Sequence, residues 1–480
     1  MTKQDLVGKK IAVLGFGMEG QAITRWLLAQ NLVPVIFDEK PFEQWADKDA
    51  NYLSENKLEI VSGPSYLDTV GNFEIIFRSP GIHRLHPKLL AAEQNGSAIT
   101  SQAKWFLENT PATVIGVTGT KGKGTTSSLI YEIIKHALES KAFDSTAKLT
   151  ENSKVYLTGN IGKTQPFEIL DTLTENDVVV FELSSFQLQD ITKSPQFAVV
   201  LMITQDHLDH HKNIDEYVSA KRNLVAHQTA EDFAVINADY PASKEFQQFT
   251  PAQVYWVSQK TRSQNGAFIS DDGNVTISGF GENISQPFVK LSELMLRGLH
   301  NLQNVSAAAL VTLKMGIKPE AIHESLIKFV GLEHRLQFVG KASGVSYYDD
   351  SFSTVPETTI AAIKAFTEPT ILILGGSEKH SNFTELAETI VKSRSIKALI
   401  VIGQTTETIL KSITDAGGFH GQILKGAASM DEIFAQITGV VESGDVVLLS
   451  PACASFGMFE NYRERGNQFA QKVQELGGTI

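Results

Sequence analysis

The sequence lacks several features that would restrict its class. It contains one cysteine, Cys453, so no disulfide can form within the chain, which agrees with a reducing compartment. We expect Cys453 to be a small buried side chain rather than a nucleophile. The longest apolar runs, such as 398–403, fall far below the roughly 18 residues that span a bilayer, and residues 1–10 lack the apolar core of a signal peptide. We therefore expect a cytoplasmic protein without membrane insertion.

Positive charge is also scarce. The chain has 42 Lys and Arg against 54 Asp and Glu, a net charge of −12, which argues against nucleic acid as the main partner. Any anionic ligand must then be held by local cations and backbone amides. The 480 residues predict about three domains, and the composition, 42% hydrophobic and 20% charged, is that of a globular protein without low-complexity segments. We expect a monomer.

The first strand-helix block contains the segment "KKIAVLGFGMEGQAITRWLLAQ" (9–30), which predicts an apolar strand, a glycine-rich turn and a helix. The pattern Gly15, Gly17, Gly20 is followed about twenty residues later by Asp38, at the end of a second predicted strand. This βαβ pattern predicts a Rossmann-like domain over 1–108. The alternative is that the glycines only pack a helix on a sheet.

The second block contains "VIGVTGTKGKGTTSS" (114–128), a strand followed by glycines, Lys123 and hydroxyls. A glycine-rich turn before a helix exposes backbone amides that bind phosphate, and Lys123 adds a charge for the β and γ phosphates. Gly124 stands where a P-loop carries Ser or Thr, so we expect Thr125 or Thr126 to supply the magnesium hydroxyl. The alternative is a glycine loop with a surface lysine.

Two apolar runs, 177–185 and 197–211, predict parallel strands in a sheet covered on both faces, within a domain at 109–331. Ligands gather at the carboxyl ends of such strands, so we expect Lys123, Glu182 and His207 at one rim, with Glu182 on magnesium. The cluster His207, His210 and His211 also suggests zinc. Loop placement without helical spacing or a cysteine partner argues against that metal.

Lys221 falls on the apolar face of a predicted helix. A lysine that faces a core is costly unless it is paired or chemically changed. Burial favours the neutral amine, which can react with carbon dioxide to give a carbamate, an anionic ligand suited to magnesium. The alternative is a lysine that extends to solvent. The other residues on this apolar face, the predicted stripe, are Ile214, Tyr217, Val218, Leu224 and Val225.

The third block, 332–480, again alternates apolar strands with helical stretches. Strands are expected at 345–351, 370–376, 398–403 and 445–453, and a helix at 356–366. The predicted fold class is therefore α/β with three domains: a Rossmann-like N-terminal domain, a central P-loop-type ATPase domain with a parallel sheet, and a Rossmann-like C-terminal domain.

The motifs occur in an order that resembles the Mur ligases, the ATP-dependent amide-forming enzymes of peptidoglycan synthesis. The last segment is similar to the glutamate-adding member of that family. The matching segments are "GFGMEG", "RSPGI" (78–82), "TGTKGKGTT", "GNIG" (159–162), "ELSSFQL" (182–188), "TQDHLDHH", "AKRNL", "LHNLQN" (299–304), "GLEHRLQ" (331–337), "DDSFST" (349–354), "GGSEKHSNF" (375–383) and "SPACASFGMFENYRERG" (450–466).

The resemblance implies roles for individual residues. For the UDP-sugar it implies Gly15, Phe16, Gly17, Met18, Asp38, Glu39, Ser79, Pro80, Gly81, Asn160, Ser184 and Gln187. For ATP it implies Gly119, Thr120, Lys121, Gly122, Lys123, Gly124, Thr125, Thr126, Asn304, Arg335 and Asp350. For glutamate it implies Thr354, Lys379, Ser455, Phe456 and Tyr462. For magnesium, as two ions, it implies Thr125, Glu182, His207 and carbamylated Lys221, and the catalytic residues would be Lys123, Glu182, His207, Lys221 and Lys379.

The implied reaction joins D-glutamate to UDP-N-acetylmuramoyl-L-alanine with ATP and Mg²⁺, through an acyl phosphate. It would serve cell-wall formation, and no flavin, NAD or zinc is expected. Two departures leave an L-glutamate-adding or folylpolyglutamate synthase-like ligase open: the loop "GKGTT" is closer to the folate enzymes, and Phe352 stands where the glutamate-adding family usually has lysine. Two further classes compete with a ligase: a dehydrogenase that uses the first glycine motif, and a regulatory protein that binds nucleotide without turnover.

Overall fold

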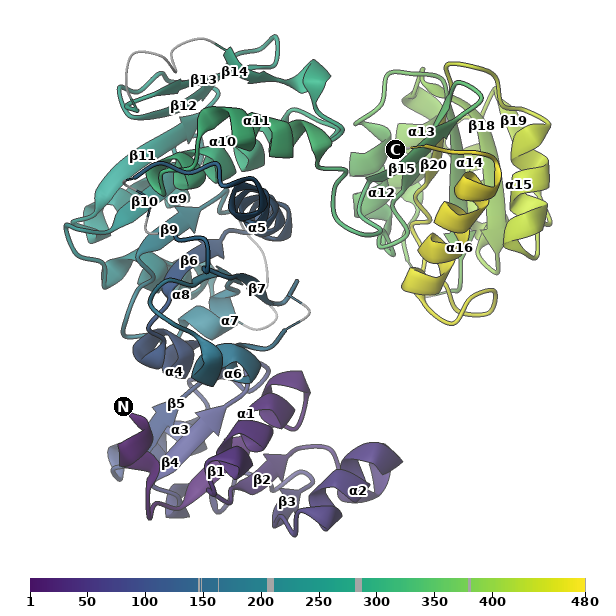
Figure 1. The fold of residues 1–480 in the computed structure, drawn as a ribbon. Helices are drawn as coiled ribbons and strands as arrows, with labels where there is room; N and C mark the ends of the chain where they lie inside the picture. The colour runs from purple at the N-terminus through teal and green to yellow at the C-terminus, as the bar shows by residue number, and fades with distance from the viewer. Residues whose placement is uncertain are drawn as a thin grey trace. The chain divides into compact units, whose positions relative to one another are not determined.

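The computed structural model describes residues 1–145, 147, 149–162, 164–204, 211–280, 287–378 and 381–479. These residues form three sheets flanked by helices, so the predicted three-domain α/β class is confirmed (Figure 1). By their contacts they divide into two compact units, Met1–Val289 with Gln303–Ser325, and Lys290–Leu302 with Leu326–Ile480. The boundaries at 108/109 and 331/332 stay predictions. In the described part of the chain, no helix has the length and apolar character needed to span a membrane.

The N-terminal sheet is parallel, with strand order β3-β2-β1-β4-β5, the order of a Rossmann-like sheet. Its central strand, Ile11–Leu14, is buried along its whole length, as expected for a strand covered on both faces. The strands are β1 Ile11–Leu14, β2 Val35–Asp38, β3 Ile60–Ser62, β4 Ile75–Arg78 and β5 Ala98–Thr100. The helices are η1 Lys3–Leu6, α1 Met18–Ala29, η2 Phe42–Gln44, α2 Asp47–Glu55, η3 Val70–Asn72, α3 Pro87–Gln94 and α4 Gln102–Asn109.

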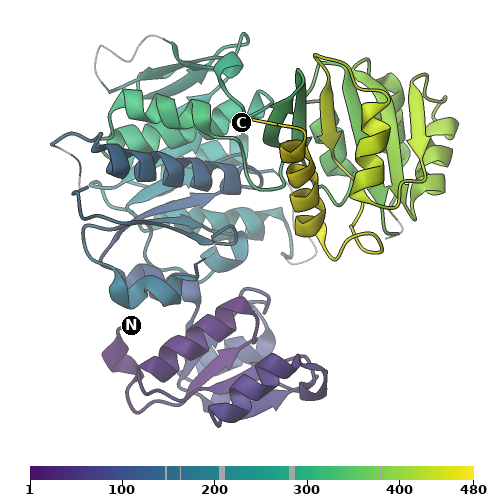
Figure 2. The same cartoon turned by 45° about the vertical axis from the view of Figure 1, so that its right-hand side comes forward.

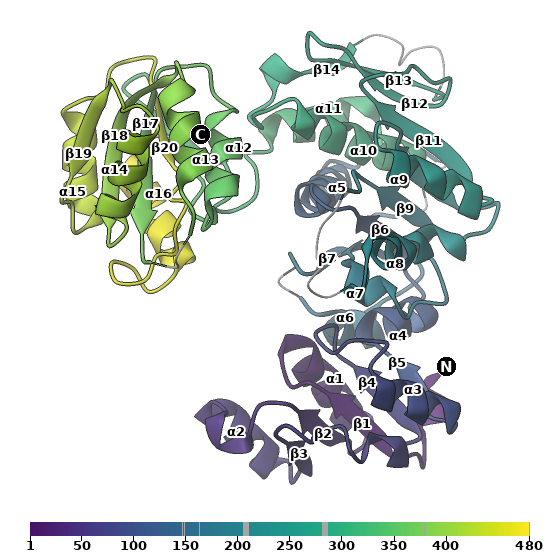
Figure 3. The same ribbon diagram turned by 180° about the vertical axis from the view of Figure 1, so that it is seen from behind.

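The central sheet has the order β14-β13-β12-β11-β10-β9-β6-β8-β7 and is parallel from β7 to β12, while β13 runs antiparallel to β12. Helices α5 and α8 lie on opposite sides of it (Figure 3). Its strands are β6 Thr113–Thr118, β7 Val155–Gly159, β8 Val178–Glu182, β9 Phe197–Val200, β10 Phe233–Asn237, β11 Gln253–Ser258, β12 Gly266–Ile269, β13 Asn274–Ser278 and β14 Pro287–Lys290. The helices are α5 Lys123–Ser140, α6 Pro166–Ile169, η4 Leu170–Thr172, α7 Ser185–Leu188, α8 Ile214–Ala226, α9 Pro241–Lys244, η5 Glu245–Phe249, η7 Leu291–Glu293, α10 His300–Lys314 and α11 Pro319–Lys328.

The C-terminal sheet has the order β15-β16-β20-β17-β18-β19, with only its edge strand β15 antiparallel. Helices cover both faces, and a separate apolar cluster fills each face (Figure 2). The strands are β15 Gln337–Ala342, β16 Val345–Asp349, β17 Thr370–Gly376, β18 Ile396–Gly403, β19 Gln422–Lys425 and β20 Val446–Leu449. The helices are α12 Pro356–Ile363, α13 Thr384–Lys392, α14 Thr406–Asp415, α15 Met430–Thr438 and α16 Tyr462–Glu475.

A buried ion pair and an apolar cluster connect the N-terminal and central sheets. Trp26 of α1 packs edge-on against Phe167 of α6, with ring centroids 4.9 Å apart, and both side chains are buried. Arg78, at the end of β4, donates through Nε to Asp190 Oδ2 at 2.8 Å, and both side chains are buried. Arg84 donates to the other oxygen of Asp190 at 2.6 Å. Paired and hydrogen-bonded in this way, the charges can be tolerated inside the protein.

Candidate active site

The loop after β6 has the backbone that a phosphate cradle needs. Gly119 has φ +156° and Gly122, which caps α5, has φ +87°, both in the region that favours glycine. A Cβ on Gly122 would lie 2.4 Å from Asn304 Oδ1, and one on Gly119 would lie 2.8 Å from Leu201 Cβ. The two glycines therefore let the chain turn tightly and leave the first N–H groups of α5 pointing out of the helix, where they can bind an anion.

Lys123 begins α5 and folds back over this loop. Its Nζ donates to the carbonyl oxygens of Gly119 at 3.0 Å and Thr120 at 3.1 Å. The ammonium group is thus held beside the amides of its own loop, as the phosphate hypothesis requires. Thr126 is fully buried, and its hydroxyl donates to Asn304 Oδ1 at 3.3 Å, whereas Thr125 is half-buried. Thr125 is consequently the better placed hydroxyl for a metal ion.

Lys221 faces the core, as its place in the sequence predicted. Only 1% of this residue is exposed, and its Nζ donates to Gly119 O at 2.9 Å. The ammonium group also lies 4.6 Å from the centroid of the Tyr217 ring, and the Tyr217 hydroxyl lies 2.9 Å from Thr120 Oγ1. Helix α8 therefore brings a buried amine to the start of the phosphate loop. One part of the predicted stripe is wrong: Ile214, at the first turn of α8, is exposed.

Glu182 ends β8 beside the same loop. It is 7% exposed, and in the parallel pairing of β6 with β8 it lies opposite Val117, two residues before Gly119. The carboxylate, the Thr125 hydroxyl and the Lys221 amine thus come from three elements that converge on one loop. An oxygen-rich set of this kind fits Mg²⁺ if Lys221 carries a carboxylate. Within the described residues, His, Cys, Asp and Glu side chains form no group of three that could hold a metal without such a change.

The histidine cluster is only partly within the described residues. His207 and His210 lie outside them, so the expected position of His207 at the rim stays a prediction. His211 is buried, its Nε2 lies 3.0 Å from Ser185 Oγ, and its ring stacks on Phe186 at 5.1 Å. Burial lowers the pKa of His211, which suits this packed position.

Helix α1 and the Asp38 carboxylate fix the glycine turn that follows β1 in the N-terminal sheet. Gly15 has φ +82°, and a Cβ on Gly20 would lie 1.8 Å from Gly15 O, so helix α1 packs directly on the turn. The Asp38 carboxylate accepts from Phe16 N at 2.8 Å and from Lys40 N at 2.9 Å. The structure thus gives Asp38 a role in fixing the turn itself. Around the turn, Met18 and Glu39 are exposed, and Ser79 donates through Oγ to Gly15 O at 3.3 Å.

Some of the residues predicted to hold the muramoyl-alanine end of the nucleotide sugar lie near this turn. Ser184 caps α7, and the Gln187 side-chain oxygen accepts from Ser184 N and Oγ, both at 3.0 Å. Gln187 Nε2 donates to Glu19 Oε1 at 2.8 Å, whereas Asn160 is exposed after β7. Glu19 was missed by the sequence analysis. Its only signal there was a carboxylate inside the pattern Gly15, Gly17, Gly20.

In the C-terminal unit, Phe352 brings two predicted site residues together. The Arg335 guanidinium lies 3.9 Å from the centroid of the Phe352 ring, and Tyr462 contacts the same ring edge-on with centroids 5.0 Å apart. A phenyl ring at this position therefore supports the arginine, which a lysine would repel.

Asp350 lies at the end of β16 and is buried. It accepts from Leu336 N at 3.0 Å, Ser450 Oγ at 2.6 Å and Ser353 Oγ at 2.5 Å. Burial raises the pKa of Asp350 to about 7, against the lowering effect of these hydrogen bonds. The predicted ATP contact is thus a buried acid that three donors hold in place.

Arg465 holds the backbone around Cys453, next to residues predicted to bind glutamate. Its role was not predicted from the sequence. Arg465 is fully buried and donates through Nη2 to Cys453 O at 3.2 Å and through Nε to Ser351 Oγ at 2.8 Å. Ser455 and Cys453 are buried, and Phe456 is 60% exposed. Thr354 is half-buried, and Lys379 lies outside the described residues.

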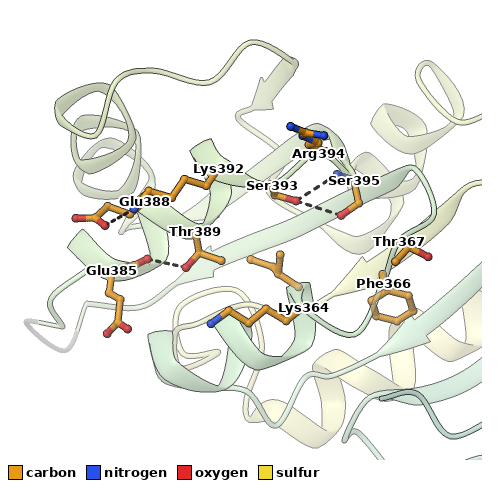
Figure 4. A pocket seen from close by; sticks show the side chains of 11 residues that line it. Lys364, Phe366, Thr367, Glu385, Glu388, Thr389, Lys392, Ser393, Arg394 and Ser395 are labelled. Atoms are coloured by element: carbon orange, nitrogen blue, oxygen red, sulfur yellow. Dashed lines mark hydrogen bonds and ion pairs between the residues drawn. The ribbon is translucent and has the colours of Figure 1, made fainter. Parts of the chain in front are cut away.

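A pocket of about 640 Å³ lies elsewhere in the C-terminal unit and includes none of the predicted site residues (Figure 4). Its walls come from α12, α13 and the segments before β17 and β18, at the amino ends of these strands. Lys392 at its edge pairs with Glu388 at 2.9 Å. Asp350 and Ser455, two of the predicted ligand contacts, instead follow β16 and β20 at the carboxyl ends of these strands, where ligands of α/β sheets bind.

Exchange of Phe352 tests whether the ring supports Arg335. We expect Phe352→Lys to lower kcat/KM by about 2- to 30-fold, the equivalent of a cation–π contact of about 0.5–2 kcal/mol, because it replaces that contact by repulsion. Phe352→Tyr keeps the ring and should stay near wild type in steady-state assays. Higher activity in Phe352→Lys would show that the lysine is simply missing from this chain.

Comparisons with known proteins match the chain along nearly its whole length. Family models match three consecutive segments: "Mur ligase MurD-like, N-terminal domain" at 9–101, "Mur ligase middle domain" at 117–312 and "Mur ligase, glutamate ligase domain" at 334–453. The UDP-N-acetylmuramoylalanine–D-glutamate ligase of Acetivibrio thermocellus is 35% identical over 99% of this chain and 98% of its own length. The enzyme of the same name from Symbiobacterium thermophilum is 35% identical over 98% of each chain.

Solved structures support the fold. The UDP-N-acetylmuramate–alanine ligase MurC of Thermotoga maritima superposes with a TM-score of 0.55 over 97% of this chain and 99% of its own, at 16% identity. The MurF ligase of Thermotoga maritima, solved in complex with ADP, gives a TM-score of 0.52 over 99% of this chain and 97% of its own, at 18% identity.

Proposed function

Because this chain belongs to the Mur ligase family, we propose that it joins D-glutamate to UDP-N-acetylmuramoyl-L-alanine with ATP. It is an ATP-dependent amide ligase of peptidoglycan synthesis. The observation that supports the finer assignment is the full-length similarity to glutamate ligases, together with a glycine-rich loop beside which Lys123, Glu182 and Lys221 lie.

The reaction must make a carboxylate reactive toward an amine. A carboxylate oxygen of the alanine end attacks the γ phosphorus of ATP, ADP leaves, and an acyl phosphate forms. The amine of glutamate then attacks the acyl carbon, a tetrahedral intermediate forms, and phosphate departs as the amide bond closes. Each step brings anions together, so the rate depends on alignment and on neutralisation of charge.

Residues of this chain would supply both the alignment of the reacting groups and the neutralisation of their charge. The amides of the loop 119–126 and Lys123 would hold the ATP phosphates, and Arg335 would neutralise charge near them. Glu182, Thr125, His207 and the carbamate of Lys221 would hold Mg²⁺, which supplies positive charge to the transferring phosphoryl group. We infer two ions, as the resemblance implies.

The nucleotide sugar would bind at the glycine turn that starts with Gly15, and the glutamate near Ser455 and Phe456. Phe352 stands where a cation was expected, so one fixed contact to the glutamate is missing. The choice between the two isomers of glutamate is therefore tested separately, with L-glutamate as the alternative substrate. The single cysteine supports a cytoplasmic setting, and we propose that the enzyme works as a monomer.

An ATP-dependent phosphate-release assay tests this function. Release should require the nucleotide sugar, glutamate and Mg²⁺ together. Equal release with a folate monoglutamate in place of the nucleotide sugar would move the assignment to the folate enzymes. ATP binding without any turnover would instead favour a regulatory protein, and tight binding of NADH would favour a dehydrogenase.

Lys379 is the remaining lysine at a position that matches the family's glutamate site. Burial of a glutamate carboxylate without a cation costs several kcal/mol unless hydrogen bonds replace it, so we propose that Lys379 carries most of this recognition. We expect Lys379→Ala to raise the KM for glutamate by about 10- to 100-fold, the loss of a charge-assisted hydrogen bond, with less effect on the KM for ATP. An unchanged glutamate KM would assign the contact to another group.

A further inference from the structure

Arg78 bonds to two parts of the protein that are distant in the sequence. It is the last residue of β4, and its side chain is fully buried. In the N-terminal sheet, Nη1 donates to the carbonyl oxygens of Ile82 at 2.6 Å and Ser79 at 3.4 Å. In the central part of the chain, Nη2 donates to the carbonyl oxygen of Phe186 at 3.1 Å, and Nε donates to Asp190 Oδ2 at 2.8 Å. One guanidinium group therefore joins the turn after β4 to helix α7 and the residues that follow it.

Asp190 is the matching anchor on the side of the central sheet. Its side chain is 2% exposed, and its second oxygen accepts from Arg84 Nε at 2.6 Å. The carboxylate thus lies between two guanidinium groups, from β4 and from the segment that follows it. A buried ion pair adds little stability compared with an apolar pair of the same size, whereas the planar fork of an arginine imposes one geometry. What this pair adds is a fixed arrangement of the two sides.

Both sides of the connection carry residues that the resemblance assigns to the nucleotide sugar. Ser79 belongs to the turn, which closes with a hydrogen bond from Ile82 N to Ser79 O at 3.1 Å. On the other side, Ser184 caps α7, and Gln187 lies within this helix. Arg78 is fully buried, so it can act on the substrate only through these neighbours.

We propose that Arg78 is a positioning residue that holds the turn 79–82 and helix α7 in one fixed arrangement, so that both parts of the nucleotide sugar are bound at once. A ligand with two parts gains affinity from its second part when the protein already holds both contact regions at the matching distance. Without Arg78, each region could bind its own part, but aligning the two would cost affinity. This inference rests on the proposed function, since it requires a nucleotide sugar that reaches from the turn to α7.

Binding of UDP and of UDP-N-acetylmuramoyl-L-alanine, each measured by isothermal titration calorimetry on the full chain, tests this role. The dissociation constant of UDP divided by that of the nucleotide sugar, the affinity ratio, measures what the muramoyl-alanine part adds. Arg78→Met breaks the connection and fills much of the same space. We expect it to lower the affinity ratio by about 5- to 30-fold, the equivalent of one or two hydrogen bonds. A loss of folded protein would lower the number of binding sites and leave the ratio unchanged.

Asp190→Asn separates the two sides of the connection. It removes the charge that holds Arg78 beside α7, while the bonds of Arg78 to the carbonyl oxygens of the turn can remain. We expect UDP to bind within about 3-fold of its wild-type affinity, and the affinity ratio to fall as in Arg78→Met. Because both substitutions break one connection, the double variant should show the ratio of Arg78→Met and no further fall.

Two further variants are matched to Arg78→Met. Arg25 of α1 pairs with Glu168 of α6 at 3.6 Å, but both side chains are about half exposed. Arg25→Met should therefore leave the affinity ratio unchanged. Arg78→Lys keeps the charge opposite Asp190, but one ammonium group cannot replace the guanidinium fork. It should unfold at a higher temperature than Arg78→Met and still show a lower affinity ratio than the wild type.

An unchanged affinity ratio in folded Arg78→Met would overturn the inference, and Arg78→Lys decides in the same way if Arg78→Met does not fold. An equal fall in Arg25→Met would also overturn it, because any ion pair between the two sheets would then be enough. If the wild-type protein is active in the phosphate-release assay, these results remove only the role of Arg78. If the wild-type protein binds the nucleotide sugar no more tightly than UDP and does not turn it over, the proposed function fails instead.

Discussion

Lys221→Ala should lose ligase activity by at least about 100-fold, measured as kcat with all substrates saturating. The substitution removes a buried amine that lies 2.9 Å from the carbonyl oxygen of Gly119, at the start of the phosphate loop. If the amine is carbamylated, its carboxylate supplies a metal ligand where negative charge must be neutralised, and loss of such electrostatic stabilisation costs about 10²–10³ in rate.

The same variant offers a chemical control. A small carboxylate added to Lys221→Ala should restore part of the activity by occupying the space of the carbamate, whereas chloride at equal ionic strength should not. Lys221→Met fills the space without a charge and should stay inactive while it folds, as judged by thermal unfolding. Full activity in Lys221→Ala, or an intact-protein mass and a high-resolution structure that both show an unmodified amine, would refute the carbamate.

Lys123→Ala should lower kcat by about 10²–10³, with a smaller effect on the KM for glutamate. Lys123 Nζ donates to two carbonyl oxygens of its own loop, so its charge is fixed beside the loop that we propose binds the ATP phosphates. Lys135→Ala, on an exposed face of the same helix, is the matched control and should leave kcat unchanged. A Lys123→Ala enzyme with wild-type kcat would mean that the loop binds phosphate through its amides alone.

Much of the fold follows from local patterns. The strand Ile11–Leu14, the turn at Gly15 and the helix from Met18 were predictable because an apolar run, glycines and a helical period follow one another within one βαβ unit. The burial of Lys221 was predictable because its spacing from Tyr217 and Leu224 is helical. Short strands such as β3 and β19 were missed, since three or four residues carry too little periodicity to recognise.

The remaining features depend on contacts between distant parts of the chain. The pairs Arg78 with Asp190 and Glu19 with Gln187 join residues more than one hundred positions apart, and no local spacing indicates them. Strand β9 ends at Val200, although the apolar run continues to Ile203, whose N–H donates to the distant Ser243 hydroxyl. In the sequence, Phe352 indicated only that an expected cation was missing. The structure shows that its ring lies against the Arg335 guanidinium.

The most direct test of the account is the mass of the product. Purified protein should be incubated with ATP, Mg²⁺, UDP-N-acetylmuramoyl-L-alanine and, in separate reactions, D-glutamate, L-glutamate and other amino acids. We predict one new species, the nucleotide sugar plus one glutamate less water, with D-glutamate as the substrate used. No glutamate adduct of the nucleotide sugar with either isomer, while ATP is hydrolysed or a folate is extended, would contradict the assignment.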